Sequence, residues 1–157
     1  MRSFLAAACA AVLVLAGSLH ACAQDVPVPT HCTPQVNAEL AQIVASGRPA
    51  TVDNVMVCGT AIGSSRTQHG RLHGDHQVIP LRVPVNGGSA LVEVVTNDDL
   101  DGVVTARRGA HVAAFGQLYV PAHGRYVAGI HDVHCSTHRG AANGWVVVDE
   151  TRYPSRC

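Results

Sequence analysis

The sequence predicts an all-β protein, built as a small barrel of five to six strands with one short helix before it. Three observations predict this fold class. After residue 50, apolar residues alternate with polar ones, which is the period of β-strands. Glycine, proline and asparagine turns separate these segments at short intervals. A closed barrel is favoured over an open sheet of this size because closure leaves no exposed edge strands.

The N-terminal residues have the character of a targeting segment. Arg2 is followed by an apolar run over residues 4–19, which is short for a membrane span. Ala21-Cys22-Ala23 fits a small-x-small cleavage site, so a signal peptide of residues 1–23 is expected. Residues 19–22 also resemble a lipoprotein processing site, which would place a lipid anchor on Cys22. Both alternatives predict an exported protein with no transmembrane span, either periplasmic or secreted, or lipid-anchored in the envelope.

Residues 24–50 contain a linker and the predicted helix. The linker holds two prolines and reads as extended chain. Thr33 is the expected N-cap and Pro34 the first helical residue, and Gly47 ends the helix. The apolar positions of this helix share one face, formed by Val36, Leu40, Ile43 and Val44.

Residues 51–157 form the predicted barrel domain. Strands are expected at residues 52–62, 76–85, 89–95, 110–120, 125–133 and 144–149. Gly59 suggests a bend or bulge in the first of these, and Pro80 and Pro84 favour an edge position or a bulge for the second. Asn86-Gly87-Gly88 is a strong hairpin turn, and residues 97–102 form an acidic turn or one short helical turn.

Cysteine usage agrees with export. Four cysteines lie outside the leader, an even number that suits disulfide bonds in an oxidising compartment: Cys32, Cys58, Cys135 and Cys157. Four cysteines allow three pairings, and the sequence does not select among them. Our first expectation is a bridge between Cys32 and Cys157, because these two residues flank the folded region. If Cys58 and Cys135 form the other bridge, Cys135 is not a metal ligand.

The charge balance argues against one class of partner. All eleven basic residues are arginines, and eleven acidic residues match them. A chain this close to neutrality lacks the basic surface that strong non-specific nucleic-acid binding requires, although a local basic patch remains compatible with it. Aromatic residues make up 4% of the chain, which counts against tight stacking on nucleic-acid bases.

The most informative segment is GIHDVHCSTHRGAANGW, residues 129–145. Within eight residues, directly after a predicted strand, it holds His131, His134, Cys135 and His138. Imidazole and thiol groups bind metals and move protons near neutral pH. A second group of histidines lies upstream in a polar loop: His69, His73 and His76.

Four segments resemble motifs of a small family of exported bacterial domains of unknown function. They are residues 74–77 (GDHQ), 96–100 (TNDDL), 109–119 (GAHVAAFGQLY) and 130–145 (beginning IH and ending GW). The corresponding family motifs are of the types HQRF, HNIDL, GDxVxFxGEY and IHWTHHDP...GW. The resemblance covers nearly all of the folded part and implies a barrel similar to the OB-fold, in agreement with the strand count. It implies no established activity.

The match to these motifs is incomplete. The positions that agree are His76, Asn97, Asp99, His131, His134, Gly144 and Trp145. The family's histidine before the asparagine is Thr96 here, and the second of its paired histidines is Cys135. Its tryptophan and aspartate are Asp132 and Ser136.

The histidines after the fifth predicted strand allow two interpretations. On a regular strand His131 and His134 face opposite sides, but a bulge or coil near Val133 would bring them to the same side. They could then bind zinc with His76, and Asp99 or Asp132 would supply a carboxylate. The alternative, which we favour, is a hydrogen-bonded network that pins loops of the barrel. Its candidate members are His76, Asn97, Asp99, His131 and His134.

Three functions from different classes remain. We favour a binding module for an anionic oligomer such as an oligosaccharide or a nucleic acid, held by the loops at residues 63–75 and 121–124. Its predicted ligand-binding residues are Arg66, Arg71, His73, His76, His123 and Arg125. The second function is a small metal-dependent hydrolase that uses His76, His131 and His134. The third is a non-enzymatic structural or interaction protein of the envelope. No GxSxG, Walker-type or dinucleotide-binding motif is present.

Overall fold

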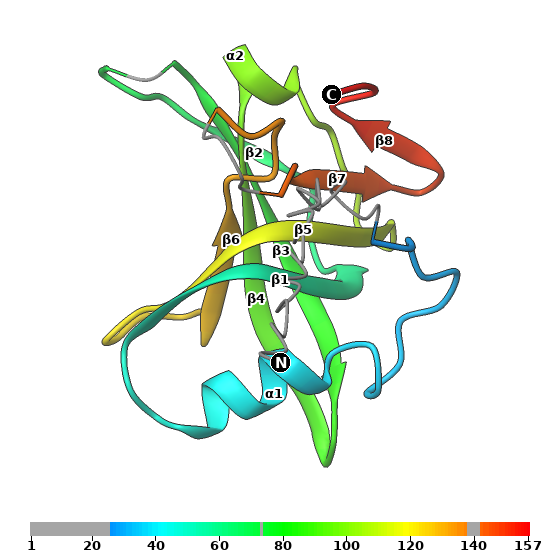
Figure 1. Ribbon diagram of the computed structural model, residues 1–157, viewed down its shortest axis with the longest axis vertical. Coiled ribbons are helices and arrows are strands. Elements are labelled where there is room, and N and C mark those ends of the chain that lie inside the picture. Colours follow the sequence, from blue (N-terminus) through cyan, green and yellow to red (C-terminus); the bar gives the residue numbers. More distant parts are fainter. Residues whose placement is uncertain (1–25, 73, 138–141) are drawn as a thin grey trace, which may run out of the picture.

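The computed structural model describes residues 26–72, 74–137 and 142–157, and it confirms the predicted fold class (Figure 1). In this part of the chain, a closed barrel of five strands follows a short helix, α1 (Ala38–Ala45). The barrel strands are β1 (Ala50–Ala61), β3 (His76–Val85), β4 (Gly88–Asn97), β5 (His111–Val120) and β6 (Ala128–His131). Outside the barrel lie β2 (Arg66–Gln68), β7 (Trp145–Val148) and β8 (Thr151–Tyr153).

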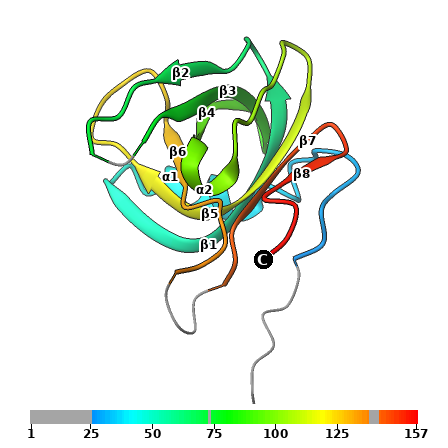
Figure 2. The same ribbon diagram turned by 90° about the horizontal axis from the view of Figure 1, so that it is seen from above.

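The barrel closes because β1 has two neighbours. The strands follow the order β1, β3, β4, β6, β5, and β5 pairs again with β1. The pair β4–β6 is parallel and the other neighbours are antiparallel. The single turn of helix α2 (Asp98–Asp101) lies over one opening of the barrel, and α1 lies at the opposite end (Figures 1 and 2).

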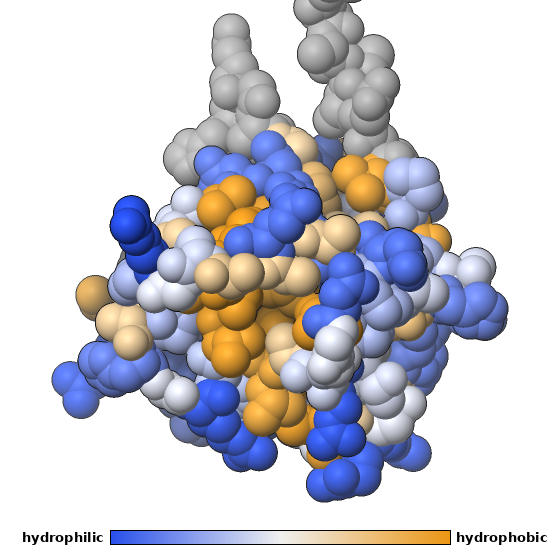
Figure 3. Space-filling model, turned by 90° about the horizontal axis from the view of Figure 1, so that it is seen from below, coloured by the Kyte–Doolittle hydropathy of each residue, from blue (hydrophilic) through white to orange (hydrophobic). Residues whose placement is uncertain are grey.

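Alternate residues of the strands point inward and form the main core, as the sequence pattern predicts. The fully buried members with the largest side chains include Leu40, Ile79, Leu81, Val83, Val92, Val94, Leu118 and Ile130. Leu40 belongs to α1, and its neighbours Ile43 and Val44 are partly buried against the same core. Seen from the α1 end, apolar residues gather in the middle of the face and polar residues surround them (Figure 3).

A second, smaller apolar cluster lies on the outer face of the barrel. Its buried members are Cys58, Ala113, Phe115, Trp145 and Val147. The Phe115 and Trp145 rings stack with their centroids 6.0 Å apart. Residues Val26, Cys32 and Val36 of the N-terminal segment pack against this cluster. The N-terminal segment is therefore a cover for the outer face of β1, β5 and β7.

The N-terminal helix begins later than predicted. Thr33 precedes a turn over residues 34–37, which begins with Pro34, and the first helical residue is Ala38. The reason is Asn37, whose buried side chain bonds to the sheet and does not cap the helix. Its Nδ2 donates to the Cys58 carbonyl at 2.9 Å, and its Oδ1 accepts from the Cys58 amide at 2.8 Å. The predicted end is confirmed, because Gly47 takes a positive φ of 63° just after the helix.

The predictions for the first and fifth barrel strands need correction. The irregularity of β1 lies between Val52 and Val55, where the pairing with β5 shifts register, and not at Gly59. At Gly59 the missing side chain instead allows close approach of the neighbouring strand, since a Cβ there would lie 2.6 Å from the Arg82 carbonyl oxygen. The fifth barrel strand is also shorter than predicted: β6 starts at Ala128 and ends at His131.

The prolines of β3 do not place it at an edge. β3 pairs along its full length with β4, whereas β2 and β1 pair only with parts of its other side. Pro80 and Pro84 fall outside these partly paired stretches, so no ladder hydrogen bond is lost there. The predicted hairpin at residues 86–88 is confirmed between β3 and β4, and the acidic segment forms α2.

The expected bridge between Cys32 and Cys157 is wrong. The disulfides join Cys32 to Cys58 and Cys135 to Cys157. Cys32 lies in the N-terminal segment that covers β1, the strand that contains Cys58. Cys157 follows β8, and because β8 pairs with β7 the chain returns to Cys135 in the loop after β6. Two disulfides are typical of proteins that fold in an oxidising compartment. Neither α1 nor α2 has the length and apolar character that a membrane span requires. The predicted signal peptide, Cys22, His73 and His138 lie outside the described residues.

Candidate functional site

A cleft of about 380 Å³ lies on the outer face of β3, β4, β6 and β5. It is lined by Gln68, His76, Glu93, Val95, Asn97, Asp101, Tyr119, His131, Asp132 and His134. The strand residues in this set alternate with core residues such as Val94, Leu118 and Ile130, which places them on the outside of the barrel. Sequence analysis singled out His76, Asn97, His131 and His134, and the structure brings all of them to this one cleft.

Strand register places the polar residues of the cleft in rows. Gln68 lies opposite His76 across β2 and β3, and His76 lies opposite Asn97 across β3 and β4. Asn97 also starts α2, where its Oδ1 accepts from the Asp99 amide at 2.9 Å. Asp99 itself is exposed and does not line the cleft. Its carboxylate lies against Gly74, where a Cβ would collide with it.

A second row crosses β4, β6 and β5 at Gly129. Glu93 and Tyr119 both pair with Gly129, one from each side. The Tyr119 ring lies across Gly129, so a Cβ on that residue would collide with the ring. The Tyr119 hydroxyl donates to Glu93 Oε1 at 2.8 Å. Burial and this bond to a carboxylate raise the pKa of Tyr119 well above its usual range, so the phenol is protonated at neutral pH.

The third part of the cleft is the turn after β6. Asp132 has a positive φ of 53°, which ends the strand and turns the chain. The Asp132 Oδ1 lies 2.9 Å from His131 Nδ1 and 3.7 Å from His134 Nε2. The His131 ring also packs against Tyr119, with centroids 5.5 Å apart. The chain therefore leaves the regular strand here, and both imidazoles reach the same side, as a bulge or coil at this point predicts.

Two glycines allow this turn to lie close to the barrel. A Cβ on Gly116 would collide with the His131 carbonyl oxygen, and one on Gly144 would collide with that of Asp132. The Gly144 amide donates to the His134 carbonyl at 2.8 Å. Gly144 is fixed in turn by its neighbour Trp145, which is only 1% exposed in the outer cluster. The Gly-Trp pair that ends the family-like motif thus holds the histidine turn in place.

Asp101 is the residue of the cleft with the most unusual environment. It is 4% exposed, and its Oδ2 accepts a hydrogen bond from the backbone amide of Asn97 at 2.6 Å. Its Oδ1 is buried without a hydrogen-bond partner among the described residues. Burial raises the pKa of Asp101, and the Asn97 bond and the proximity of His134 only partly offset this effect. Burial therefore favours the protonated form of the Asp101 carboxyl group.

Sequence reasoning missed Gln68, Glu93 and Asp101, and it placed Tyr119 alongside the binding loops but not among the predicted ligand-binding residues. For Glu93 and Tyr119 the available signal is the strand alternation, which places both on the outer face. Nothing in the sequence shows that Gly129 lies between them, because this depends on pairing between distant strands. Asp101 differs from Asp99 only by its position within one helical turn.

The other predicted ligand-binding residues in the described part of the chain do not line the cleft. Arg66 and Arg71 are exposed, and Arg66 lies two residues before Gln68, on the same side of β2. His123 and Arg125 lie in the loop between β5 and β6, where Arg125 sits 5.7 Å from the centre of the Tyr126 ring. The backbone amide of Val127 in that loop donates to the Leu91 carbonyl. The loop therefore lies beside the first half of β4, which is the half remote from α2.

The predicted zinc ligands share the cleft without gathering around one point. Among the described residues, the one set of three metal-binding side chains whose ligating atoms lie within 4.8 Å of one another is Cys32, Cys58 and His111. The imidazoles of His76, His131 and His134 do not meet that condition. The ligand set of the hydrolase hypothesis is therefore not assembled in this structure.

Comparisons of the chain with protein-family models, with curated proteins and with solved structures find no match. The resemblance to the exported family therefore stays a prediction that depends on the motifs alone. A functional proposal for this protein depends on the geometry of the cleft.

Proposed function

We propose that the protein is an exported OB-like binding module whose cleft takes a short acidic oligosaccharide. The strand arrangement supports the OB-like assignment. Five strands close into a barrel, and a helical turn lies between the third and fourth of them. OB-folds bind ligands on the face of their second and third barrel strands. In this chain those strands are β3 and β4, which supply His76, Glu93, Val95 and Asn97 to the cleft.

The observation that carries the proposal is the chemistry of the cleft wall. Carboxylates, imidazoles and amides lie side by side, so hydrogen-bond donors and acceptors alternate at short spacing. This mixture suits the hydroxyl groups of a sugar, each of which both donates and accepts. Tyr119 and His131 add an aromatic surface beside these groups.

The acidic residues of the cleft favour a sugar over a nucleic acid. Glu93, Asp101 and Asp132 line the same cleft, and ionised carboxylates among them repel a phosphate backbone. A nucleic acid would need a groove with a positive balance along its length. A sugar with an isolated acidic group needs only one nearby cation. Arg66, exposed on the cleft side of β2, is suited to that role.

The test is binding of a panel of neutral and acidic oligosaccharides, and of single-stranded oligonucleotides, to the purified protein by isothermal titration calorimetry. We expect saturable binding of an acidic oligosaccharide. Arg66→Ala should weaken binding of the acidic ligand at least about tenfold but leave a neutral analogue unaffected, since a charge-assisted contact contributes about 1.5–3 kcal/mol. His131→Ala should weaken both ligands, and Arg125→Ala, in the remote loop, should weaken neither. Tighter binding of oligonucleotides than of every sugar would contradict the proposal.

A further inference from the structure

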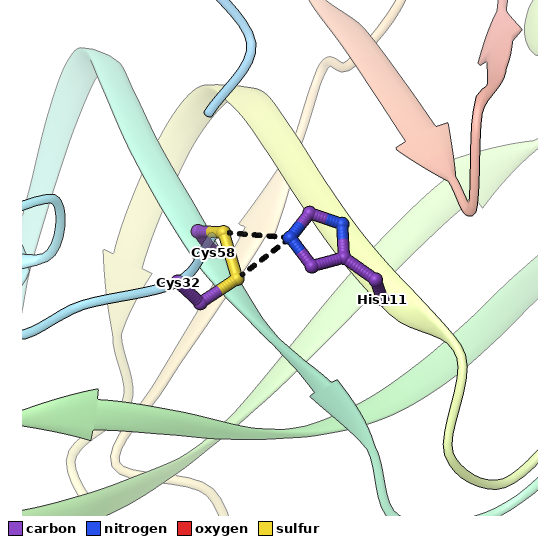
Figure 4. A group of neighbouring side chains, drawn as sticks. All are labelled: Cys32, Cys58 and His111. Carbon is purple, nitrogen blue, oxygen red and sulfur yellow. Dashed lines mark hydrogen bonds between the residues drawn. A yellow bond between two sulfur atoms is a disulfide. The ribbon is translucent and has the colours of Figure 1, made fainter. Parts of the chain in front are cut away.

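A second group of reactive side chains lies away from the cleft, on the outer face of β1 and β5. The Nε2 atom of His111 lies 3.2 Å from the Sγ of Cys32 and 3.6 Å from the Sγ of Cys58 (Figure 4). Cys58 is fully buried, whereas Cys32 and His111 are partly exposed. The group therefore borders solvent on one side and the outer apolar cluster on the other.

The sheet fixes the position of His111 relative to Cys58. Cys58 pairs with Ala113, and His111 lies two residues before Ala113, on the same face of β5. Asp149 holds the backbone of His111 at both of its polar groups: its Oδ1 accepts from the His111 amide at 2.9 Å, and its amide donates to the His111 carbonyl at 2.8 Å. The imidazole is thus held beside the sulfur atoms by the barrel, independently of the disulfide.

We propose that Cys32, Cys58 and His111 are the oxidised form of a zinc site. When the disulfide is reduced, the two thiolates and the His111 Nε2 bind one Zn²⁺, and water takes the fourth position. Two sulfur ligands and one imidazole nitrogen are a common zinc ligand set, and thiolates select such soft cations. This site is separate from the cleft and does not depend on the proposed function.

The redox step needs a two-electron reductant, for which we propose a dithiol. The dithiol gives two electrons and two protons to the Cys32–Cys58 bridge, its own disulfide forms, and Cys32 and Cys58 become thiols. Zinc binding then releases the two thiol protons to solvent, and His111 coordinates as the neutral imidazole. With Zn–S distances of about 2.3 Å and tetrahedral angles, the sulfurs stand about 3.7 Å apart, so they separate by roughly 1.7 Å from their bonded distance.

The fold keeps Cys32 near its partner after reduction. Asn37, five residues along the chain, holds both backbone groups of Cys58 and also donates to the Pro84 carbonyl at 3.0 Å. Val26 and Val36, on either side of Cys32, pack against the outer cluster. These contacts do not involve the disulfide, so the ligands remain close together when it opens.

The test uses the variant in which Cys135→Ser and Cys157→Ser remove the other disulfide. A phosphine reductant is suitable because phosphine and water yield the phosphine oxide and two thiols, and no competing thiol is added. Zinc is added to the oxidised and reduced forms, and bound metal is measured after gel filtration. We expect one zinc per reduced chain and none per oxidised chain. With Co²⁺ in place of zinc, the reduced chain should show thiolate-to-cobalt charge-transfer absorption.

Two further variants make the result decisive. His111→Ala should weaken zinc binding at least about tenfold, because even loss of a partner outside the ligand set costs 10–100-fold. His131→Ala, in the cleft, should leave it unchanged. A reduced chain that stays folded by circular dichroism without binding zinc overturns the proposal, as does equal affinity in His111→Ala. If reduction unfolds the chain, recovery of the fold on adding zinc supports the proposal, and failure to recover overturns it.

Discussion

Gly129 is the position at which a single methyl group would test the geometry of the cleft. In Gly129→Ala the new Cβ meets the Cζ and hydroxyl of Tyr119. The strand backbone on both sides is paired, so it cannot move away without breaking the pairing of β6 with β4 or β5. The Tyr119 ring must therefore swing out, and its bond to Glu93 is lost.

The expected cost follows from these contacts. Loss of a hydrogen bond to a charged group costs about 1.5–3 kcal/mol. Replacement of glycine by alanine recovers about 0.4–1 kcal/mol, because it reduces the freedom of the unfolded chain. We therefore expect Gly129→Ala to lower the free energy of unfolding by roughly 1–2 kcal/mol. It should also weaken oligosaccharide binding, because Tyr119 lines the cleft and its ring is displaced.

The measurement is urea denaturation followed by circular dichroism, with binding measured on the same samples. Gly63→Ala is the matched control, because a Cβ there would meet only Pro80 Cγ at an ordinary 3.6 Å, and its stability should change by less than about 0.5 kcal/mol. Tyr119→Phe removes the hydroxyl and keeps the ring, so it should lose stability but less of the binding. Gly129→Ala with unchanged stability and unchanged affinity would refute the described arrangement of Tyr119 over Gly129.

Three further predictions concern single residues. Asn37→Ala should lower the free energy of unfolding by about 2–4 kcal/mol, because it leaves the buried backbone groups of Cys58 without partners; a loss below 0.5 kcal/mol in chemical denaturation would contradict this. Asp101→Asn should raise stability by on the order of 1 kcal/mol at pH 7 and by little near pH 3. Because folding raises the pKa of Asp101, the native protein loses stability as pH rises above 3.8. If the stability gained by Asp101→Asn did not change with pH, burial of the carboxylate would not be its cause. In an ultraviolet pH titration Tyr119 should ionise only well above pH 10.0, and Tyr119→Phe should remove this step. Because folding raises the Tyr119 pKa above 10.0, stability should fall as pH rises beyond that value.

Local patterns in the sequence predict much of the barrel. Alternation predicts β3 with its observed bounds, and it predicts β4 and β5 within a few residues of theirs. The Asn-Gly-Gly turn identifies the hairpin between β3 and β4. These features depend on neighbours in the chain, so they can be recognised without knowledge of the fold. The N-terminal helix shows the limit of this approach, since Asn37 bonds to Cys58 and delays the helix that Thr33 and Pro34 predict.

Contacts between distant segments explain the remaining differences. The pairing of Cys32 with Cys58 depends on the N-terminal segment lying over β1. The cleft likewise depends on register, because Glu93 and Tyr119 meet only when β6 places Gly129 between them. The histidines were predictable as a group by residue type and spacing. Asp101 was not, because it lies in the same helical turn as the exposed Asp99 and differs from it only in orientation.

The central claim is that the outer face of β3, β4, β6 and β5 holds a ligand. Its most direct test is a nuclear magnetic resonance titration of the isotope-labelled protein with the best acidic oligosaccharide from the panel. We expect the amide signals of Gln68, Asn97, Tyr119 and His131 to shift together and to saturate. Shifts that cluster instead around His123 and Arg125, or an unchanged spectrum with every sugar of the panel, would contradict the account.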